Sequence, residues 1–233
     1  MHTANSWIYD LAGLATPWGL PALTLAALAW AASRHPWPLL RRNALQNAWL
    51  GALVLLALLW TVRAVVTGGL VIQLMGATLA VTLFGLPLAL VSLFIVDVIS
   101  LLGLAYLGGQ GWQQIEWAQI WPRFVWMGLL PALVTAVLQS AMRRWLPRHP
   151  FVFILGHGYF AAGLAAMAAG AAQALGRYWF HPVGEVPHLA DELLALIIVA
   201  FGEAFLTGIL VAIFVIYKPQ WVVTFRDEEY LRQ

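Results

Sequence analysis

The chain contains no cysteine, and only 9% of its 233 residues are Asp, Glu, Lys or Arg. Without thiols it has neither disulfides nor thiolate metal sites. Soluble domains carry roughly 25% charged residues, so this scarcity of charge excludes a water-soluble fold. The formal net charge is +2. Because the basic residues lie at the ends of apolar segments, membrane topology explains them better than nucleic acid does, and we expect no nucleic-acid partner.

The sequence also lacks the common catalytic motifs. It has no G-x-x-x-x-G-K-[ST] loop, no H-E-x-x-H helix and no G-x-S-x-G elbow. The first absence means that a partner must hydrolyse ATP if the protein works in powered transport. The other two absences remove two common hydrolytic sites. We expect a protein that is not an enzyme and has no permanently bound cofactor.

What the sequence does have is long apolar segments, and hydrophobic residues make up 62% of the chain. A helix needs about 20 residues to cross a bilayer. The pattern predicts an all-α, polytopic membrane helix bundle of one domain with about seven transmembrane helices. The candidate spans are approximately Pro17–Ser33, Ala44–Val66, Leu70–Phe84, Leu88–Leu107, Phe124–Met142, Phe151–Ala174 and Leu193–Tyr217.

Two of the connections between these spans are informative. Gly85-Leu86-Pro87 is a tight break, and it leaves open whether the third and fourth spans are one bent segment. The segment Gly108–Pro122 is rich in Gln and Trp, so we expect a surface loop at the membrane interface, where tryptophan is enriched.

The distribution of Lys and Arg predicts the orientation. An odd number of spans puts most basic residues on one side, which is cytoplasmic by the positive-inside rule. That side receives Arg34, Arg41, Arg42, Arg143, Arg144, Arg148, Lys218, Arg226 and Arg232, whereas the other receives Arg63, Arg123 and Arg177.

This orientation divides the chain into three parts. We expect an extracytoplasmic N-terminal segment at 1–16, a transmembrane domain at 17–217 and a cytoplasmic tail at 218–233 in the cell (inner) membrane. The first segment carries Asp10 but no basic residue, so it lacks the n-region of a signal peptide and is expected to stay attached.

The last span and its exit resemble a known family. The residues are Phe201-Gly202-Glu203-Ala204-Phe205-Leu206-Thr207-Gly208, Val211-Ala212 and Lys218-Pro219-Gln220-Trp221. They resemble the G-E-A-x-x-T-G helix and basic-Pro exit of the CbiM/NikM-type membrane subunits of cobalt and nickel energy-coupling-factor transporters. Thr67-Gly68-Gly69 before Gln73-Leu74-Met75-Gly76 is similar to the Gly-rich approach to that family's H-L-L-G segment. A divergent branch of this family is therefore expected.

The resemblance implies capture of a divalent metal ion as cargo. In that family the N-terminal amine, the second residue's backbone nitrogen and its imidazole bind a square-planar ion, and Met1 and His2 carry these atoms here. Such a donor set suits Ni(II) or Cu(II) better than Zn(II), with Co(II) also an option. The family's fourth ligand is a histidine where this chain has Gln73, whose amide oxygen is a harder ligand. His181 and His188, in the external loop between the sixth and seventh spans, are alternative ligands.

Three ionisable residues lie inside predicted spans: Asp97, His157 and Glu203. A charged acid facing lipid at the bilayer centre costs at least about 2.5–3.5 kcal/mol, so these groups are expected to face the bundle. For each acid, a role in ion passage and a role as a hydrogen-bonded brace between helices both remain open. His157 lies between Gly156 and Gly158, which permits close approach of another helix, and it is either a core residue, a ligand or a proton relay.

The family resemblance also implies partners besides the lipid bilayer: an energy-coupling transmembrane subunit and paired ATPase subunits. Ala22 and Ala26, four residues apart, are candidate contacts with the coupling subunit, and packing within the chain is the competing interpretation. Two alternative functions stay open. One is an orphan membrane scaffold or binding protein that retains the fold without metal transport, and the other is an intramembrane enzyme.

Overall fold

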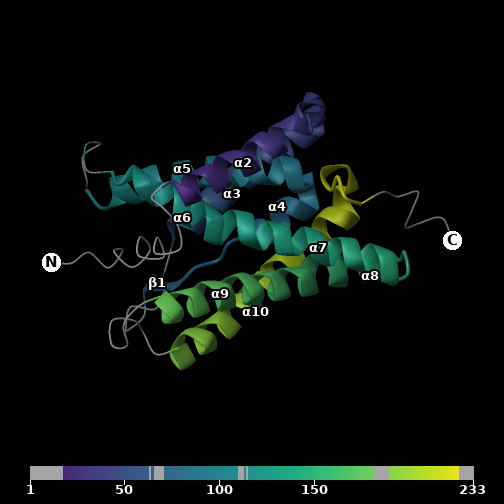
Figure 1. Ribbon diagram of the computed structural model, residues 1–233. Helices are drawn as coiled ribbons and strands as arrows, with labels where there is room; N and C mark the ends of the chain where they lie inside the picture. The colour runs from purple at the N-terminus through teal and green to yellow at the C-terminus, as the bar shows by residue number, and fades with distance from the viewer. Residues whose placement is uncertain are drawn as a thin grey trace.

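The computed structural model describes residues 18–62, 64–65, 71–109, 113, 115–180 and 189–225. These residues form a helical bundle whose elements run back and forth along one long direction (Figure 1). The α-helices are α2 Gly19–Ser33, α3 Asn43–Thr61, α4 Ala77–Phe84, α5 Leu86–Leu107, α6 Ile120–Arg123, α7 Leu130–Trp145, α8 Pro150–Val152, α9 Ala161–Phe180 and α10 Leu189–Tyr217.

Shorter elements connect or extend these helices. The 3₁₀ turns are η2 Trp37–Arg41, η4 Trp117–Gln119 and η7 Pro219–Trp221, and the π-helices are η5 Phe124–Leu129 and η6 Phe153–Phe160. Two-residue strands β1 Ala64–Val65 and β2 Val71–Ile72 pair antiparallel, with Ala64 opposite Ile72.

Five helical stretches in the described part of the chain are long and apolar enough to cross a membrane. They are Asn43–Thr61, Leu86–Leu107, Trp117–Trp145, Pro150–Gly176 and Ala190–Tyr217, and the apolar helix α2 is shorter at 15 residues. The prediction of a helical bundle is confirmed, whereas seven spans and their orientation stay predictions.

The prediction of a helical span over Leu70–Phe84 is wrong for its first half. Val71 and Ile72 form strand β2, residues 73–76 have no regular structure, and helix begins only at Ala77. β-branched Val71 and Ile72 favour a strand, and Gly76 adopts φ +62°, a left-handed conformation that interrupts a helix. Hydrophobicity alone does not distinguish a buried strand from a buried helix, which is why the pattern misled.

The predicted surface loop Gly108–Pro122 is also shorter than expected. The turn η4 lies inside it and helix α6 begins inside it, and Ile115, Gln119 and Ile120 are buried. Ile115 and Ile120 pack with Leu101 and Ala105 of α5. Apolar contacts with α5 therefore bring the end of this segment into the bundle.

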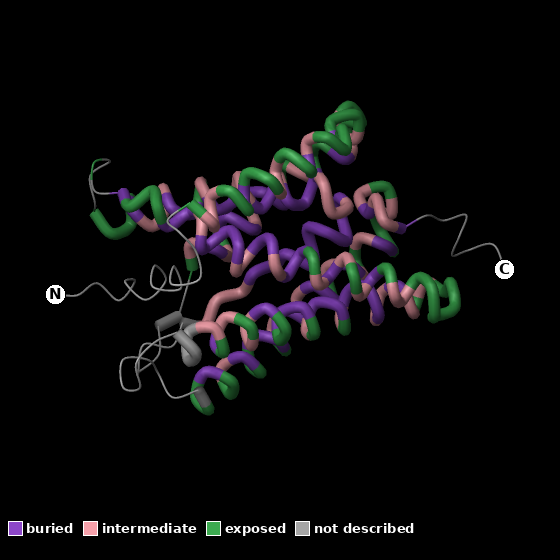
Figure 2. Tube along the Cα trace, viewed as in Figure 1, coloured by how far each residue is buried: buried purple, intermediate pink, exposed green. Residues whose placement is uncertain are grey.

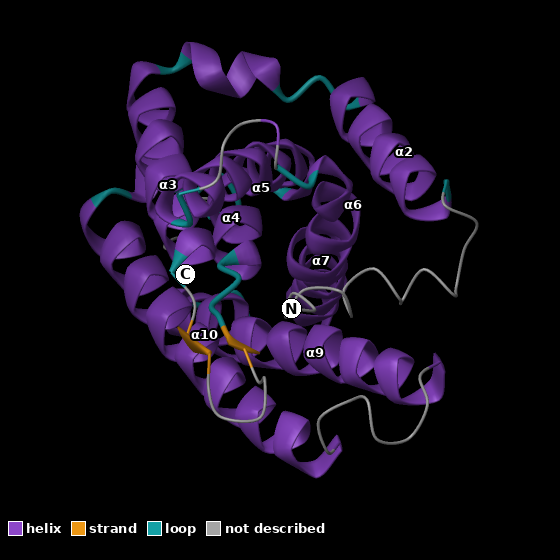
Figure 3. Cartoon of the chain, turned by 90° about the vertical axis from the view of Figure 1, so that its left-hand side faces the viewer, coloured by secondary structure: helices purple, strands orange, loops and turns teal. Residues whose placement is uncertain are grey.

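Within each long helix, one side is buried in the bundle and the other is more exposed. The helix faces that meet one another are buried, and the outer faces are exposed (Figure 2). Helix α10 exposes large apolar side chains outward, among them Ile198, Phe201 and Phe205, which is the pattern expected of a helix facing lipid. Viewed end-on, α4 lies at the centre (Figure 3), and all eight of its residues are buried.

Small residues allow α9 and α10 to approach closely. A Cβ atom added at Gly163 would lie 3.3 Å from Cβ of Ala204, and one at Gly170 would lie 2.2 Å from Cδ1 of Leu196. This agrees with the role of small residues in packing helices in lipid. It also fixes the position of α10, which carries Glu203.

We expect Gly76→Ala to destabilise the protein while Gly51→Ala does not. Alanine at φ +62° is strained by roughly 1–2 kcal/mol, and its Cβ would lie 2.3 Å from Cδ2 of Leu56. Gly51 lies within α3 with no such neighbour within 4 Å, so alanine there should be neutral or slightly stabilising. Thermal unfolding in detergent measures both, and equal shifts of the midpoint would contradict the assignment of strain to Gly76.

Candidate functional site

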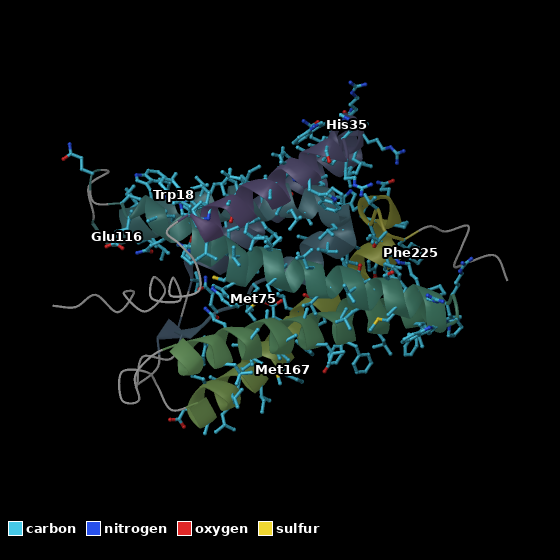
Figure 4. All side chains as sticks on the ribbon, in the orientation of Figure 1. Trp18, His35, Met75, Glu116, Met167 and Phe225 are labelled. Carbon is cyan, nitrogen blue, oxygen red and sulfur yellow. The ribbon has the colours of Figure 1, made fainter. Side chains whose placement is uncertain are left out.

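The irregular segment Gln73–Gly76 and the first turn of α4 meet the side chain of Glu203 at the centre of the bundle. The backbone N–H of Met75 donates to Oε1 of Glu203. The N–H of Gly76 donates to the same carboxylate, 3.0 Å from Oε1 and 3.2 Å from Oε2. In Figure 4, Met75 lies between the end of the bundle that carries Glu116 and the end that carries His35.

Two further hydrogen bonds close the same segment from the side of α3. The indole Nε1 of Trp60 donates to the carbonyl of Met75 at 2.6 Å. The Nε2 of Gln73 donates to the carbonyl of Trp60 at 2.6 Å. That carbonyl belongs to the last turn of α3, where no intrahelical donor is available. Trp60 and Gln73 therefore join the broken segment to α3, and Glu203 joins it to α10.

The arrangement satisfies an electrostatic requirement of buried backbone. The four N–H groups at the start of a helix have no intrahelical partner and carry partial positive charge. Glu203 is 2% exposed and supplies negative oxygen atoms at that position, capping α4 from another helix. Non-helical backbone at membrane depth persists only where protein or a water-filled cavity surrounds it. The expectation that Glu203 faces the bundle is confirmed.

A row of polar side chains continues from this point between α4 and α7. The hydroxyl groups of Thr78 and Thr135 lie 2.7 Å apart, and Nε2 of Gln139 donates to Oγ1 of Thr82 at 2.7 Å. Both pairs are separated by 57 residues in the sequence, so the two helices are parallel with one register. All four side chains are at most 2% exposed. The polar side chains of the row therefore hydrogen-bond to one another and do not face lipid.

The π-helix η6 places His157 beside this row. The carbonyl of His157 accepts hydrogen bonds from Gln139 at 3.3 Å and from Thr82 at 3.4 Å. Its ring stacks on Phe153 with centroids 4.6 Å apart, and its Nδ1 has no hydrogen-bond partner among the described residues. The flanking glycines admit neighbours, since a Cβ at Gly158 would lie 3.2 Å from Cβ of Val211 in α10. The predicted close helix approach is confirmed.

Asp97 and Arg123 form a separate buried ion pair between α5 and α6. Nε of Arg123 lies 3.3 Å from Oδ1 of Asp97, and their side chains are 8% and 0% exposed. The Nη2 atom of Arg123 also donates to Oγ of Ser100 at 2.7 Å. The structure therefore gives Asp97 the contact of an acid that pairs helices. Arg123 was counted among the basic residues of the external side, and its side chain is buried against Asp97 inside the bundle.

Of the predicted metal ligands, the structure describes only Gln73. Met1, His2, His181 and His188 lie outside the described residues, and Gln73 lies in the broken segment with its amide nitrogen donating to Trp60. Within the described ranges, no group of three or more His, Cys, Asp or Glu is arranged to hold a metal ion. The predicted ligand set therefore stays a prediction.

The remaining candidates have distinct locations. Ala22 and Ala26 of α2 are both exposed, and their contact with a coupling subunit stays a prediction. Asp97, His157 and Glu203 have different polar neighbours, and no hydrogen bond or ion pair found among the described residues joins any two of them. A shared catalytic arrangement of these three side chains is not observed.

Sequence reasoning missed Trp60, Arg123 and the α4–α7 row. The row had a signal, because Thr78 and Thr82 are four residues apart, as are Thr135 and Gln139. Residues at that spacing share one helix face. Trp60 gave no comparable signal, since a tryptophan near the end of a span is normally assigned to the membrane interface.

No family model, curated protein or solved structure matches this chain. The fold and the composition define a helical bundle with the length and apolarity of a membrane protein. Its finer assignment depends on the residues of the site.

We expect Glu203→Ala to destabilise the protein strongly and Glu203→Gln to do so less. Alanine leaves the N–H groups of Met75 and Gly76 without their acceptor, and each unsatisfied buried group costs about 1–3 kcal/mol. Glutamine retains one acceptor oxygen but loses the charge. Thermal unfolding in a lipid nanodisc gives the midpoints of the parent, Glu203→Gln and Glu203→Ala, which should fall in that order. Asp191→Ala, at an exposed position, is the control. A Glu203→Ala midpoint equal to that of the parent would contradict the capping role.

A second expectation concerns the buried ion pair. Arg123→Ala should destabilise by about 3–5 kcal/mol, because it leaves the carboxylate of Asp97 buried without its cation. Replacing both residues, Asp97→Leu with Arg123→Met, should be much milder, since no buried charge remains. The apparent unfolding midpoints of Asp97→Leu alone, Arg123→Met alone and the double variant test this coupling, with Arg34→Ala as an exposed control. Additive effects would show that the pair is not coupled.

Proposed function

We propose that the chain is a membrane transport component that captures a small substrate on the extracytoplasmic side. The observation that supports this best is the interrupted passage of β2, residues 73–76 and α4 through the centre of the bundle, held by Glu203. Membrane transporters commonly build substrate sites from interrupted helices near the middle of the bilayer. A bundle made for structure alone has no need of such a break.

The proposed topology has seven passages, with the N-terminus outside and the C-terminus in the cytoplasm of the cell membrane. In it, the short passage through β2 and α4 counts as one crossing and α2 as another. Support comes from the charges. The C-terminal ends of α2, α7 and α10 lie at one end of the bundle (Figure 1), and Arg34, Arg143, Arg144 and Lys218 lie in or directly after these ends. Glu116 lies at the end opposite His35 (Figure 4). Cytoplasmic ends of membrane proteins are enriched in Lys and Arg.

The cargo proposed is a divalent transition metal ion, nickel- or cobalt-like, bound by the N-terminal amine and His2 with a further ligand from Gln73, His181 or His188. This rests on the resemblance to CbiM/NikM-type subunits. The amide nitrogen of Gln73 is engaged with Trp60, so its oxygen is the atom that would bind a metal ion. Uptake would then require an energy-coupling subunit, for which the exposed Ala22 and Ala26 of α2 offer a small-residue face, and ATPase subunits.

A second candidate function is a membrane scaffold that retains the fold without transport. It is favoured by the engagement of the intramembrane acids, since Glu203 caps α4 and Asp97 pairs with Arg123. Both acids then have structural roles that need no substrate. The two candidates differ in whether the purified protein binds a metal ion.

The deciding experiment measures nickel binding by calorimetry and absorption spectroscopy, on protein with an authentic, untagged N-terminus. We expect one ion per chain, and His2→Ala should weaken binding at least roughly 100-fold, because even an outer-shell residue costs 10–100-fold. Gln73→His should strengthen binding, since imidazole is the better ligand for nickel. His35→Ala, an exposed histidine at the opposite end, serves as the control. Absence of binding by folded, untagged protein would favour the scaffold.

The topology needed for this capture is tested on the same protein. Because the chain has no cysteine, single variants Trp18→Cys and Gln220→Cys report each end with a membrane-impermeant maleimide. Labelling of the first in intact cells, and of the second only after permeabilisation, is the expected result. If both sites react only after permeabilisation, extracytoplasmic capture is excluded.

A further inference from the structure

Helix α4 is held at both of its ends by one continuous stretch of chain. At its N-terminal end, Met75 and Gly76 donate to Glu203 of α10. At its C-terminal end, the N–H of Val223 donates to the carbonyl of Leu83 at 2.7 Å. The hydroxyl of Thr224 donates to the carbonyl of Thr82 at 2.5 Å. Val223 and Thr224 follow α10 directly after the turn η7.

The geometry requires the chain to turn back after α10. Eight residues make α4 about 12 Å long, whereas the fourteen residue steps from Glu203 to Tyr217 rise about 21 Å. Lys218 and η7 reverse the chain, and the following residues reach the end of α4 (Figure 1). We name Val222–Phe225 the C-terminal strap. In Figure 4, Phe225 lies at the opposite end of the bundle from Trp18.

The C-terminal strap is packed as well as hydrogen-bonded. Val222 is 1% exposed, and both Val222 and Phe225 belong to the apolar cluster that contains Leu83, Phe84 and Phe153. The rings of Phe225 and Phe153 meet edge to face at 5.0 Å, and Phe153 in turn stacks on His157. The strap thus contacts both α4 and η6.

Both attachments are needed because helix ends expose unsatisfied groups. The first four N–H and the last four carbonyl groups of a helix lack intrahelical partners. Half of the backbone N–H and carbonyl groups in an eight-residue helix are therefore terminal, and all eight residues of α4 are buried, so these groups need partners within the protein. Glu203 and the C-terminal strap supply partners at opposite ends, so the position of α4 depends on both.

We propose that Glu203 and the C-terminal strap form a clasp that couples the strap end of the bundle to the Gln73–Gly76 segment at its centre. Release of the strap shifts α4 and loosens the contact of Met75 and Gly76 with Glu203. Release of Glu203 loosens the strap in return, since coupling between two sites is reciprocal. The coupling is independent of the cargo and holds for a transporter and for a scaffold alike.

Cysteine reactivity tests the clasp, because the chain contains no native cysteine. Leu74→Cys reports the central segment and Val222→Cys reports the strap, each by its rate of reaction with a water-soluble maleimide in nanodiscs. Thr224→Val removes the hydroxyl donor, and Val223→Pro removes the N–H donor. We expect Thr224→Val and Val223→Pro each to raise the rate of maleimide reaction at Leu74→Cys roughly tenfold, within the 5–150-fold range of allosteric coupling.

Matched controls keep the donors. Val223→Ala retains the N–H and Thr224→Ser retains the hydroxyl, so both should leave the rate at Leu74→Cys within about twofold of the parent, a shift below the 5-fold floor of typical coupling. In the reciprocal test, Glu203→Gln should raise the rate at Val222→Cys.

The outcomes are distinct. A faster reaction at Val222→Cys in the strap variants without any change at Leu74→Cys overturns the proposal, because the strap is then released without moving α4. No change at either reporter also overturns it, because the two hydrogen bonds then do not anchor the strap. Should Val223→Pro fail to fold, Thr224→Val alone supplies the same comparison.

Discussion

Two backbone N–H groups at the centre of an apolar bundle set the main constraint on this structure. Gly76 takes a left-handed conformation, the chain before it is irregular, and the N–H groups of Met75 and Gly76 have no helical partner. Water is not available to them in hydrocarbon, where each unsatisfied polar group costs several kcal/mol. The carboxylate of Glu203 is the acceptor for both. Its position at the start of α4 and the close contact of α10 with α9 together determine the depth at which α10 packs.

The remaining polar contacts can be understood as consequences of the same interruption. Trp60 and Gln73 satisfy groups that the break exposes on the side of α3. The hydroxyls of Thr78 and Thr82 lie on one face of α4, and α7 presents Thr135 and Gln139 to them in matching register. Helix α4 is therefore held by hydrogen bonds as well as by its apolar contacts. The ion pair of Asp97 and Arg123 is independent of this network and joins α5 to α6.

Hydrophobic pattern predicted most of the bundle but not its centre. The long helices were predictable because apolar length is a strong signal, and the inward position of Glu203 followed from the cost of a charge in lipid. The break before Ala77 was not predictable from hydropathy, since Val71 and Ile72 are as apolar in a strand as in a helix. Arg123 was counted with the basic residues of the external side, and the hydrophobic pattern gave no sign that it pairs with Asp97 inside the bundle. Long-range pairs of this kind depend on tertiary packing, which a single sequence does not display.

The interrupted passage also limits how a substrate can use this protein. The N-terminal end of α4 would attract an anionic group, but Glu203 already occupies both of the N–H groups at the break. A substrate at that position would have to displace a buried carboxylate and leave it without partners, at a cost of about 1–3 kcal/mol or more. A cation would meet Trp60 and Gln73, whose N–H donors are directed to carbonyl groups. In the proposed function, initial capture therefore belongs to the N-terminal amine and His2 outside this centre, and the oxygen of Gln73 is the ligand that the interrupted passage can add.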